Sequence, residues 1–424
     1  MEVAVIGAGY VGLIQAAGLA HLGNRVRLGE SNGGRVAALK RGELPIYEPG
    51  LGDLFDRAVN QGLLSFHTDN LAAVHGAQVV FLTLPTPPDG NGAADLSFIE
   101  AVIDEIGPHL GPDVTLVTKS TVPVGTAARL QQRLADLGSD AGIVSNPEFI
   151  AEGHAVDDFL KAERVVIGAF ERSHANRVAH LYRGLSAEIV VTDPATAELV
   201  KYASNAYLAT RLTYANSIAN LAEDLGADAP TVLRAMGLDR RIGPAFLRPG
   251  PGYGGSCFPK DTRAFLAIAL NHGYDFSILR AVIEADELQR TRIVDRCAAL
   301  LDGSLEGKRI AVWGIAFKAG TDDTRESPAL RLAAGLSLLG ADVVMTDPEA
   351  STDDFVTMPN PVAASRDAEL VLVATEWPEF LRAELDEVAK VMAGDIVFDV
   401  RNLLDPSAVR AAGLRYVGLG RPTA

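Results

Sequence analysis

The stretch GGSCFPKD, residues 254–261, places one of the chain's two cysteines beside a lysine and an aspartate. Cys257 follows a segment so rich in glycine and proline that it cannot form a regular helix or strand, so we expect its thiol at a surface or in a cleft. A nearby lysine favours the thiolate, which can attack an aldehyde to give a thiohemiacetal. Loss of a hydride to an acceptor would then leave a thioester. The sulfur would thereby carry the oxidation of an alcohol past the aldehyde to the acid.

The two cysteines also admit plainer interpretations. Cys257 could be an inert small residue of a loop, and Cys297, in the helical pattern RIVDRCAALL, fits a structural role better than a chemical one. Two cysteines are too few for a disulfide framework, and their spacing is not that of a zinc site. We therefore expect reduced thiols and no bound metal.

A dinucleotide-binding fingerprint opens the chain. The strand-forming segment EVAVIG leads into GAGYVG, a helical segment follows, and NRVRLGE forms the next strand. Gly7, Gly9 and Gly12 fit the motif G-x-G-x-x-G, which permits a tight turn, close approach to a pyrophosphate and packing of the helix on the strand. Glu30 ends the second strand, where a carboxylate accepts hydrogen bonds from a ribose and repels a 2′-phosphate. The sequence predicts NAD rather than NADP, although the nearby Arg35 makes this preference less sharp.

The composition is that of a soluble multidomain protein. With 424 residues the chain is too long for one compact core, and hydrophobic residues make up 48% of it, with a mean hydropathy of +0.15. The formal charge of −16 argues against binding nucleic acid or an anionic membrane, but it permits a local basic pocket for phosphates. No apolar run reaches about 18 residues, and the N-terminus enters a strand directly instead of a signal peptide. We expect a cytoplasmic protein.

Three regions follow from the pattern along the chain. Strand-forming segments continue to Asp193, which predicts an NAD-binding Rossmann-like domain over residues 1–193. The segment from Pro194 to Gly226 is helical throughout, and later helical stretches predict a central helical and dimerisation domain over 194–300. Residues 301–424 return to alternating strands and helices and predict a second Rossmann-like domain, for which the family resemblance given below implies a bound UDP-sugar. The expected fold class is α/β: two Rossmann-like domains with parallel sheets flank a central helical domain built on a long helix.

The second Rossmann-like region differs from the first in its loop. It lacks G-x-G-x-x-G and offers Lys318 and Arg325 instead, while Asp347 ends its second strand and Arg401 follows a later strand. Charged side chains at such strand ends could hold a second, nucleotide-like ligand.

Eight motifs occur together and in order along the whole chain: GAGYVG, LPIYEPGL, STVP, NPEFIAEG, KYASNAYLA, RIGPAFLRPGPGYGGSCFPKD, FKAGTDDTRESP and TEW. On these motifs the chain resembles the UDP-glucose 6-dehydrogenases of the UDP-glucose/GDP-mannose dehydrogenase family, and the run from Arg241 to Asp261 is the most specific part. The resemblance implies two NAD-dependent oxidations that convert the C6 hydroxymethyl group of UDP-glucose to a carboxylate, giving UDP-glucuronate. It also implies a homodimer or a larger homo-oligomer.

The resemblance assigns roles to the residues around the thiol. Cys257 would be the nucleophile, and Lys201 and Asn205 would stabilise the oxyanion. Asp261 would act with an ordered water in proton transfer. Read without the resemblance, Lys201 would be an ordinary lysine on a helix face.

Two further residues are implied in the hydrolysis step. Glu148 would activate water for hydrolysis of the thioester, and Thr121 would help to place that water. A glutamate near a proline turn is, without this context, a solvated or capping carboxylate, although burial would suit it to act as a base.

The same motifs imply ligand contacts that combine backbone, apolar and cationic groups. For the UDP-sugar the implied contacts are Glu148, Phe149, Ile150, Ala151, Glu152, Lys201, Asn205, Arg241, Phe246, Arg248, Pro249, Gly250, Pro251, Gly252, Tyr253, Gly254, Cys257, Phe317, Lys318 and Arg401. For NAD they are Gly7, Gly9, Val11, Gly12, Glu30, Arg35, Thr86, Thr121, Glu152 and Arg325. Arg241 resembles a residue that reaches the neighbouring subunit's site, although residues 240–241 alone would read as a solvated turn.

One residue departs from the family pattern. Glu30, preceded by Gly29, takes the place of the usual aspartate at the end of the second strand. The longer acid should still reach a ribose, and its effect on NAD affinity stays open.

Several alternatives remain at the level of the sequence. A GDP-mannose dehydrogenase uses the same cysteine chemistry and a related GGSC loop. Dehydrogenases of N-acetylated UDP-sugars usually carry a histidine in the corresponding glycine loop, which the Ser256–Cys257 pair of this chain does not match. A nucleotide-sugar sensor or scaffold without turnover belongs to another class, and it predicts ligand binding with no NADH. A single-step hydroxyacid dehydrogenase would leave Cys257 unexplained.

Overall fold

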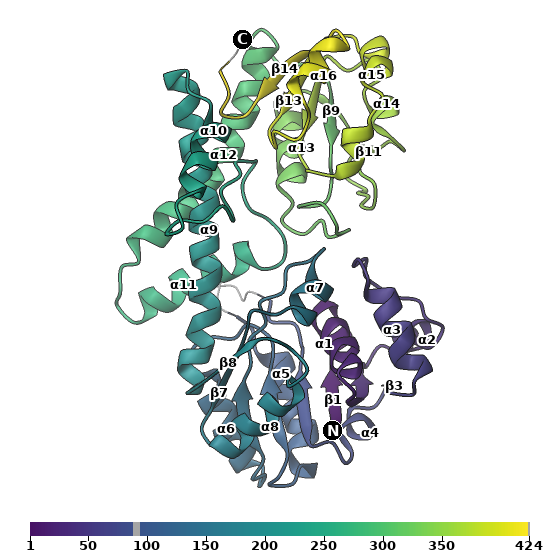
Figure 1. The fold of residues 1–424 in the computed structure, drawn as a ribbon, viewed down its shortest axis with the longest axis vertical. Coiled ribbons are helices and arrows are strands. Elements are labelled where there is room, and N and C mark those ends of the chain that lie inside the picture. Colours follow the sequence, from purple (N-terminus) through teal and green to yellow (C-terminus); the bar gives the residue numbers. More distant parts are fainter. Residues whose placement is uncertain (88–93, 423–424) are drawn as a thin grey trace. The chain divides into compact units, whose positions relative to one another are not determined.

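The computed structural model describes residues 1–87 and 94–422. The chain divides into two compact units, Met1–Ser204 and Asn205–Ala424, and each unit contains one sheet (Figure 1). Within the part of the chain that is described, no helix has the length and apolar character needed to cross a membrane.

The first unit is built on an eight-stranded sheet with the order β3-β2-β1-β4-β5-β6-β7-β8. Its strands are β1 Glu2–Ile6, β2 Arg25–Gly29, β3 Leu64–His67, β4 Val79–Leu82, β5 Thr115–Thr118, β6 Gly142–Ser145, β7 Arg164–Ala169 and β8 Glu188–Thr192. The expected βαβ opening and the strands around β4 to β7 are therefore confirmed.

The first sheet departs from the expected parallel arrangement at one pair of strands. Strands β6 and β7 are antiparallel, with Ser145 opposite Gly168, and every other pair in the sheet is parallel. A parallel pair needs a connection that returns the chain along the sheet, usually over a full helix. The connection here contains only α7, Ala155–Leu160, whose six residues span about 9 Å. The chain therefore enters β7 from the edge at which β6 ended.

Strand β1 is buried on both of its faces, which shows that the first sheet is covered on both sides. Val3 and Val5 belong to one hydrophobic cluster, whereas Ala4 and Ile6 belong to another, as expected from the two-residue period of a strand. The helices are α1 Tyr10–His21, α2 Gly33–Lys40, α3 Leu51–Asn60, α4 Asn70–Val74, α5 Ser97–Ile106, α6 Thr126–Asp136, α7 Ala155–Leu160 and α8 Arg172–Leu181, and a 3-10 turn, η1, covers Gly107–His109.

The expected long helix is α9, Pro194–Leu225, of 32 residues. A proline opens it, where its missing N–H is not needed, and Gly226 follows its last residue with a φ of 67°. Small residues dominate its buried positions, including Ala209, Ala215 and Ala219. Small side chains allow other elements to pack closely against the helix.

The second unit combines helices with a six-stranded parallel sheet of order β11-β10-β9-β12-β13-β14. Its helices are α10 Ala229–Gly237, α11 Phe258–Asn271, α12 Ser277–Leu300, α13 Pro328–Leu338, α14 Pro361–Ala364, α15 Leu385–Val391 and α16 Pro406–Ala411, with a 3-10 turn, η2, at Pro378–Arg382. Its strands are β9 Arg309–Trp313, β10 Asp342–Thr346, β11 Val356–Thr357, β12 Leu370–Val373, β13 Ile396–Asp399 and β14 Arg415–Gly418. The second Rossmann-like region is confirmed.

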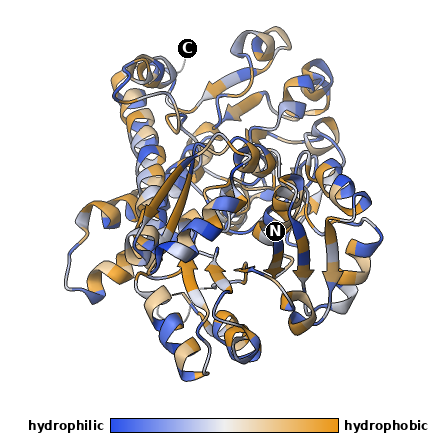
Figure 2. Cartoon of the chain, turned by 60° about the horizontal axis from the view of Figure 1, so that its bottom comes forward, coloured by the Kyte–Doolittle hydropathy of each residue, from blue (hydrophilic) through white to orange (hydrophobic). Residues whose placement is uncertain are grey.

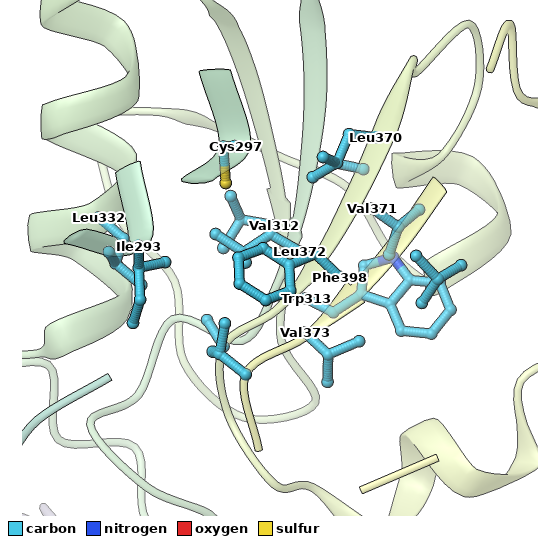
Figure 3. Packing of buried hydrophobic residues seen from close by; sticks show 14 of the residues in the cluster. Ile293, Cys297, Val312, Trp313, Leu332, Leu370, Val371, Leu372, Val373 and Phe398 are labelled. Carbon is cyan, nitrogen blue, oxygen red and sulfur yellow. The ribbon is translucent and has the colours of Figure 1, made fainter. Parts of the chain in front are cut away.

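The core of the second unit lies between this sheet and the helices beside it. Figure 3 shows Ile293 and Cys297 of α12 with Leu332 of α13 and residues of β9, β12 and β13. Trp313 is fully buried and its indole N–H donates to Ser365 Oγ at 3.2 Å. Figure 2 shows helices that carry hydrophobic and hydrophilic residues side by side, as expected for elements with one face in such a core.

The two cysteines occupy contrasting environments. Cys297 is fully buried among apolar side chains, and this burial raises the pKa of its thiol to about 12. Cys257 is half-buried at the start of α11. The expectation that Cys297 is structural and Cys257 accessible therefore agrees with the fold.

We predict that Cys297→Ser lowers the free energy of unfolding by about 1 to 3 kcal/mol, because a hydroxyl enters an apolar core. Cys257→Ser is the matched control and should change it by less than about 0.5 kcal/mol. Thermal unfolding followed by circular dichroism compares the two variants. Equal melting temperatures for both would contradict the assignment of Cys297 to the core.

Candidate active site

The glycines of the first loop have the three roles expected of a dinucleotide-binding turn. Gly7 has a φ of 105°, and a Cβ there would lie 2.7 Å from the carbonyl oxygen of Thr83. A Cβ at Gly12 would lie 1.9 Å from the carbonyl oxygen of Gly7, so α1 could not approach β1 as it does. At Gly9, the N-cap of α1, a Cβ would meet nothing within 4 Å. The open space at Gly9 and the free N–H groups of the first helical turn suit a pyrophosphate.

Glu30 closes the same turn from the end of β2. Its carboxylate accepts hydrogen bonds from Ala8 N at 3.2 Å and Asn32 N at 2.9 Å. Arg35 donates to Glu30 Oε2 at 3.2 Å, so these two predicted cofactor residues lie together. The residues present therefore fit an NAD at this turn.

Two other predicted cofactor residues meet at the ends of neighbouring strands. The hydroxyl of Thr86, after β4, donates to the carbonyl oxygen of Thr121, after β5, at 3.1 Å. Carboxyl ends of parallel strands share one edge of a sheet, and this is the edge at which Rossmann-like folds bind ligands.

Lys201 and Glu148 form a buried ion pair. Lys201 Nζ lies 2.7 Å from Glu148 Oε1, and the two side chains are 4% and 7% exposed. The other carboxylate oxygen accepts from Ile150 N at 2.8 Å, and the Phe149 ring lies 5.6 Å from the ammonium. Glu148 is thus held by a charge, a backbone N–H and its own loop, unlike a solvated capping carboxylate.

A second cluster lies in the first turn of α11, the helix that Cys257 caps. Cys257 is the N-cap of this 14-residue helix, and its carbonyl oxygen accepts from Asp261 N at 2.8 Å. Asp261 is 1% exposed and accepts from Asn205 Nδ2 at 2.6 Å and from Lys260 Nζ at 2.7 Å. The positive end of the helix dipole favours an anionic sulfur at this position.

Helix α9 supplies both oxyanion candidates. Lys201 and Asn205 are four residues apart on it, so their side chains project from the same face one turn apart. One helix therefore carries a residue that holds Glu148 and a residue that holds Asp261.

The glycine-rich loop before Cys257 is locked by buried polar groups of α9 and α12. Gly250 N donates to Asn216 Oδ1 at 2.8 Å, and Gln289 donates to the Gly250 carbonyl oxygen at 3.0 Å. Tyr253 N donates to Asp286 at 2.9 Å, and a Cβ at Gly252 would lie 2.7 Å from the same carboxylate. These anchors prevent the loop from carrying larger residues.

The predicted nucleotide contacts of the second sheet gather at its strand ends. Arg401, after β13, donates to the carbonyl oxygens of Ala374 at 2.9 Å and Phe317 at 3.3 Å. A Cβ at Gly250 would lie 3.0 Å from the Arg401 guanidinium, and Lys318 Nζ lies 5.6 Å from the Phe317 ring. The carbonyl oxygen of Arg325 accepts from Gly255 N at 3.1 Å. Arg401 also pairs with Glu376 at 3.0 Å, so its guanidinium is charge-balanced where this edge of the sheet meets the glycine loop.

Three of the predicted UDP-sugar contacts lie outside these clusters. The Arg241 side chain is 83% exposed and pairs with Asp239 at 2.6 Å. Phe246, with a φ of 57°, and Arg248 are exposed on the same loop. The contact of Arg241 with a neighbouring subunit and the UDP-sugar contacts of Phe246 and Arg248 stay predictions.

Family models match three successive parts of the chain. The NAD binding domain of the UDP-glucose/GDP-mannose dehydrogenase family matches residues 1–186, its central domain 195–287 and its UDP binding domain 311–406. The chain belongs to this family.

Relatives of the family match over nearly the full length. A UDP-glucose 6-dehydrogenase of Bacillus subtilis is 40% identical over 99% of this chain and 93% of its own length. One from Pseudomonas aeruginosa is 39% identical over 100% and 98%. The solved structure of a UDP-glucose dehydrogenase from Pyrobaculum islandicum superposes with a TM-score of 0.91 at 36% identity, covering 99% of this chain and 97% of that one.

Sequence reasoning missed a buried lysine beside the Glu148 loop. Lys119 Nζ donates to Asn146 Oδ1 at 3.1 Å, and burial lowers the pKa of Lys119 to about 7. Together with Val11, Glu148 and Phe149 it lines a cavity of about 340 Å³ in the first unit. Nothing in the single letter K of TKSTVP distinguishes it from a surface lysine.

Glu48 was also missed, although it lies in the quoted motif LPIYEPGL. It accepts from Gly153 N at 2.6 Å, from Ala155 N at 2.8 Å and from the Tyr10 hydroxyl. It therefore fastens the loop that contains the predicted sugar contacts Phe149 to Glu152 to the cofactor turn.

We predict that Gly9→Ala and Gly12→Ala separate two effects. Gly12→Ala should lower the melting temperature because its methyl group collides with the turn, whereas Gly9→Ala should leave the melting temperature unchanged. Both should raise the KM for NAD by about tenfold or more, since each blocks close approach of a pyrophosphate. Unfolding curves and NAD titrations measure this. A Gly9→Ala enzyme with normal NAD affinity would contradict the proposed position of the pyrophosphate.

Proposed function

We propose that the protein is an NAD-dependent UDP-glucose 6-dehydrogenase, which oxidises UDP-glucose to UDP-glucuronate and releases two NADH. Cys257 carries this proposal: it lies at the N-terminus of α11, beside the Asn205–Asp261–Lys260 cluster, in a chain of this family. A dehydrogenase that stopped at the aldehyde would have no use for this sulfur.

NAD, when bound, accepts the hydride that leaves C6 of the sugar in each of the two oxidations. Gly7, Gly9, Gly12 and Glu30 would hold it, with the further contacts Val11, Arg35, Thr86, Thr121, Glu152 and Arg325. The Glu30 carboxylate would repel a 2′-phosphate, which supports NAD over NADP.

In the first half of the proposed reaction, the hydroxyl proton of C6 leaves through a water held by Asp261, and an aldehyde forms. The Cys257 thiolate then attacks the aldehyde carbon, forming a C–S bond and an alkoxide. The Lys201 ammonium and the Asn205 amide stabilise that alkoxide, because both donate hydrogen bonds from one face of α9. Loss of the second hydride leaves a thioester on Cys257.

In the second half, water attacks the thioester carbon and gives its proton to Glu148, the C–S bond breaks, and Cys257 leaves as the thiolate. Thr121 would help to place the water. The geometry of Glu148 supports this role, because its buried carboxylate is held in place at both oxygens, by Lys201 and by Ile150 N. The acid so formed loses its remaining proton to solvent, so the product carries a carboxylate at C6.

The proposed UDP-sugar contacts come from loops of both units. We propose that the loops from Phe149 to Glu152 and from Arg248 to Gly254 surround the sugar and diphosphate, and that Lys318 and Arg401 meet the phosphates or uridine. The positions of Arg401 and Lys318 beside Phe317, at the strand ends of the second unit, support this assignment. The same proposal includes domain boundaries at 193 and 300 and a cytoplasmic location. It also includes a homodimer in which Arg241 completes the partner's site.

A GDP-mannose dehydrogenase is the main alternative, and a nucleotide-sugar-binding protein without turnover is the other. The first would use the same thiol, and the second would bind a sugar nucleotide without forming NADH. A panel of UDP-glucose, UDP-N-acetylmannosamine and GDP-mannose, read at the nicotinamide absorbance, separates these functions. Preferred turnover of GDP-mannose would overturn the choice of substrate.

We predict that the wild type releases two NADH for each UDP-glucose and that mass spectrometry identifies UDP-glucuronate. Cys257→Ser should lose at least about 100-fold in rate, because a hydroxyl in place of the thiolate is a far weaker nucleophile. Its melting temperature should match the wild type. A wild type that releases one NADH and a free aldehyde, or an unimpaired Cys257→Ser enzyme, would contradict the thioester route.

A further inference from the structure

Glu198 is a buried acid that has no role in the reaction described so far. It lies on α9, three residues before Lys201, and is 3% exposed. Its carboxylate accepts hydrogen bonds from Gly125 N at 2.7 Å, Ala127 N at 2.8 Å and Ser145 Oγ at 3.1 Å. Burial raises the pKa of Glu198, and these hydrogen bonds oppose that effect. An acid that is this fully paired contributes geometry rather than proton transfer.

The three donors belong to the two strand-end segments that carry the proposed hydrolysis residues. Gly125 and Ala127 begin α6, in the segment that leaves β5 through Thr121. Ser145 ends β6, three residues before Glu148. Gly125 has no side chain with which to cap α6, so the carboxylate from α9 caps it instead.

Glu198 and Lys201 also share a face of α9, because residues three apart on a helix are neighbours. Lys201 holds Glu148 at 2.7 Å, and Glu198 holds Ser145 on the same segment. The β6 segment is therefore attached to α9 at two points, and the β5 segment is attached at Glu198. We propose that Glu198 is a positioning residue that sets Thr121 and Glu148 relative to Lys201 for the hydrolysis of the thioester. This inference rests on the proposed function.

Glu198→Gln is the first test, since it keeps the volume of the side chain but puts an amide NH2 group against backbone N–H donors. We expect kcat to fall between about tenfold and 100-fold with UDP-glucose, because a small misplacement of reacting groups costs this much. The KM for UDP-glucose and for NAD should stay within about twofold. Since hydrolysis is the step affected, intact-protein mass during turnover should show the acyl adduct on Cys257.

Glu223→Gln is a matched control on the same helix. Glu223 also accepts a backbone N–H, that of Gly420 at 2.6 Å, and pairs with Arg296. Its partners include none of the proposed reaction residues. We expect this variant to lower the melting temperature, as Glu198→Gln does, but to keep kcat within about twofold of the wild type.

Three outcomes would overturn the inference: normal kcat in a folded Glu198→Gln enzyme, equal loss of kcat in the two variants, or a loss without the adduct. If Glu198→Gln does not fold, Ser145→Ala removes one of its hydrogen bonds, and a kcat within twofold of the wild type would then count against the inference. Failure of the proposed function is distinguishable because it appears in the wild type, as missing turnover of UDP-glucose. The comparison would then use the sugar nucleotide that the panel identifies.

Discussion

The ion pair between Lys201 and Glu148 constrains this protein more than any other interaction. Removing an ammonium and a carboxylate from water costs several kcal/mol for each ion, and only close pairing with further hydrogen bonds offsets that cost. The pair meets this condition, with 2.7 Å between the charged atoms and a backbone N–H on the second carboxylate oxygen. The β6 segment and α9 must therefore keep their relative position. The placement of Glu148 beside Lys201 depends on that position.

The acidic residue that follows the second strand has different surroundings in the two Rossmann-like sheets. Glu30 and Asp347 both end the second strand of a βαβ unit, and both accept backbone N–H groups of the first loop. Asp347 is also held by the indole N–H of Trp377, at 2.9 Å. Its carboxylate is thus occupied by its own loop and by the Trp377 indole. Glu30 instead borders a glycine turn with open space at Gly9.

Much of this could be predicted from the sequence, for physical reasons. The roles of Gly7 and Gly12 could be predicted because only glycine readily adopts the φ of 105° at Gly7, and because any Cβ at Gly12 would lie 1.9 Å from a carbonyl oxygen. The length of α9 could be predicted from its uninterrupted helical pattern. The structural role of Cys297 could be predicted from its apolar neighbours in the sequence. The burial of Lys119 and Glu198 could not be predicted, because the sequence does not distinguish a buried charged side chain from a solvated one. The antiparallel β7 depends on the shortness of α7, which no local pattern shows. The contact of Arg241 with a neighbouring subunit stays a prediction, because it involves a second copy of the chain.

The central claim is that Cys257 carries the sugar as a thioester which Glu148 helps to hydrolyse. Intact-protein mass spectrometry of Glu148→Gln, mixed with UDP-glucose and excess NAD, tests this most directly. The account predicts a stable increase in mass equal to an acyl-linked UDP-glucuronyl group, located on Cys257 by peptide mapping and absent from the Glu148→Gln, Cys257→Ser double variant. An unmodified Cys257 in an enzyme that still forms NADH would contradict it.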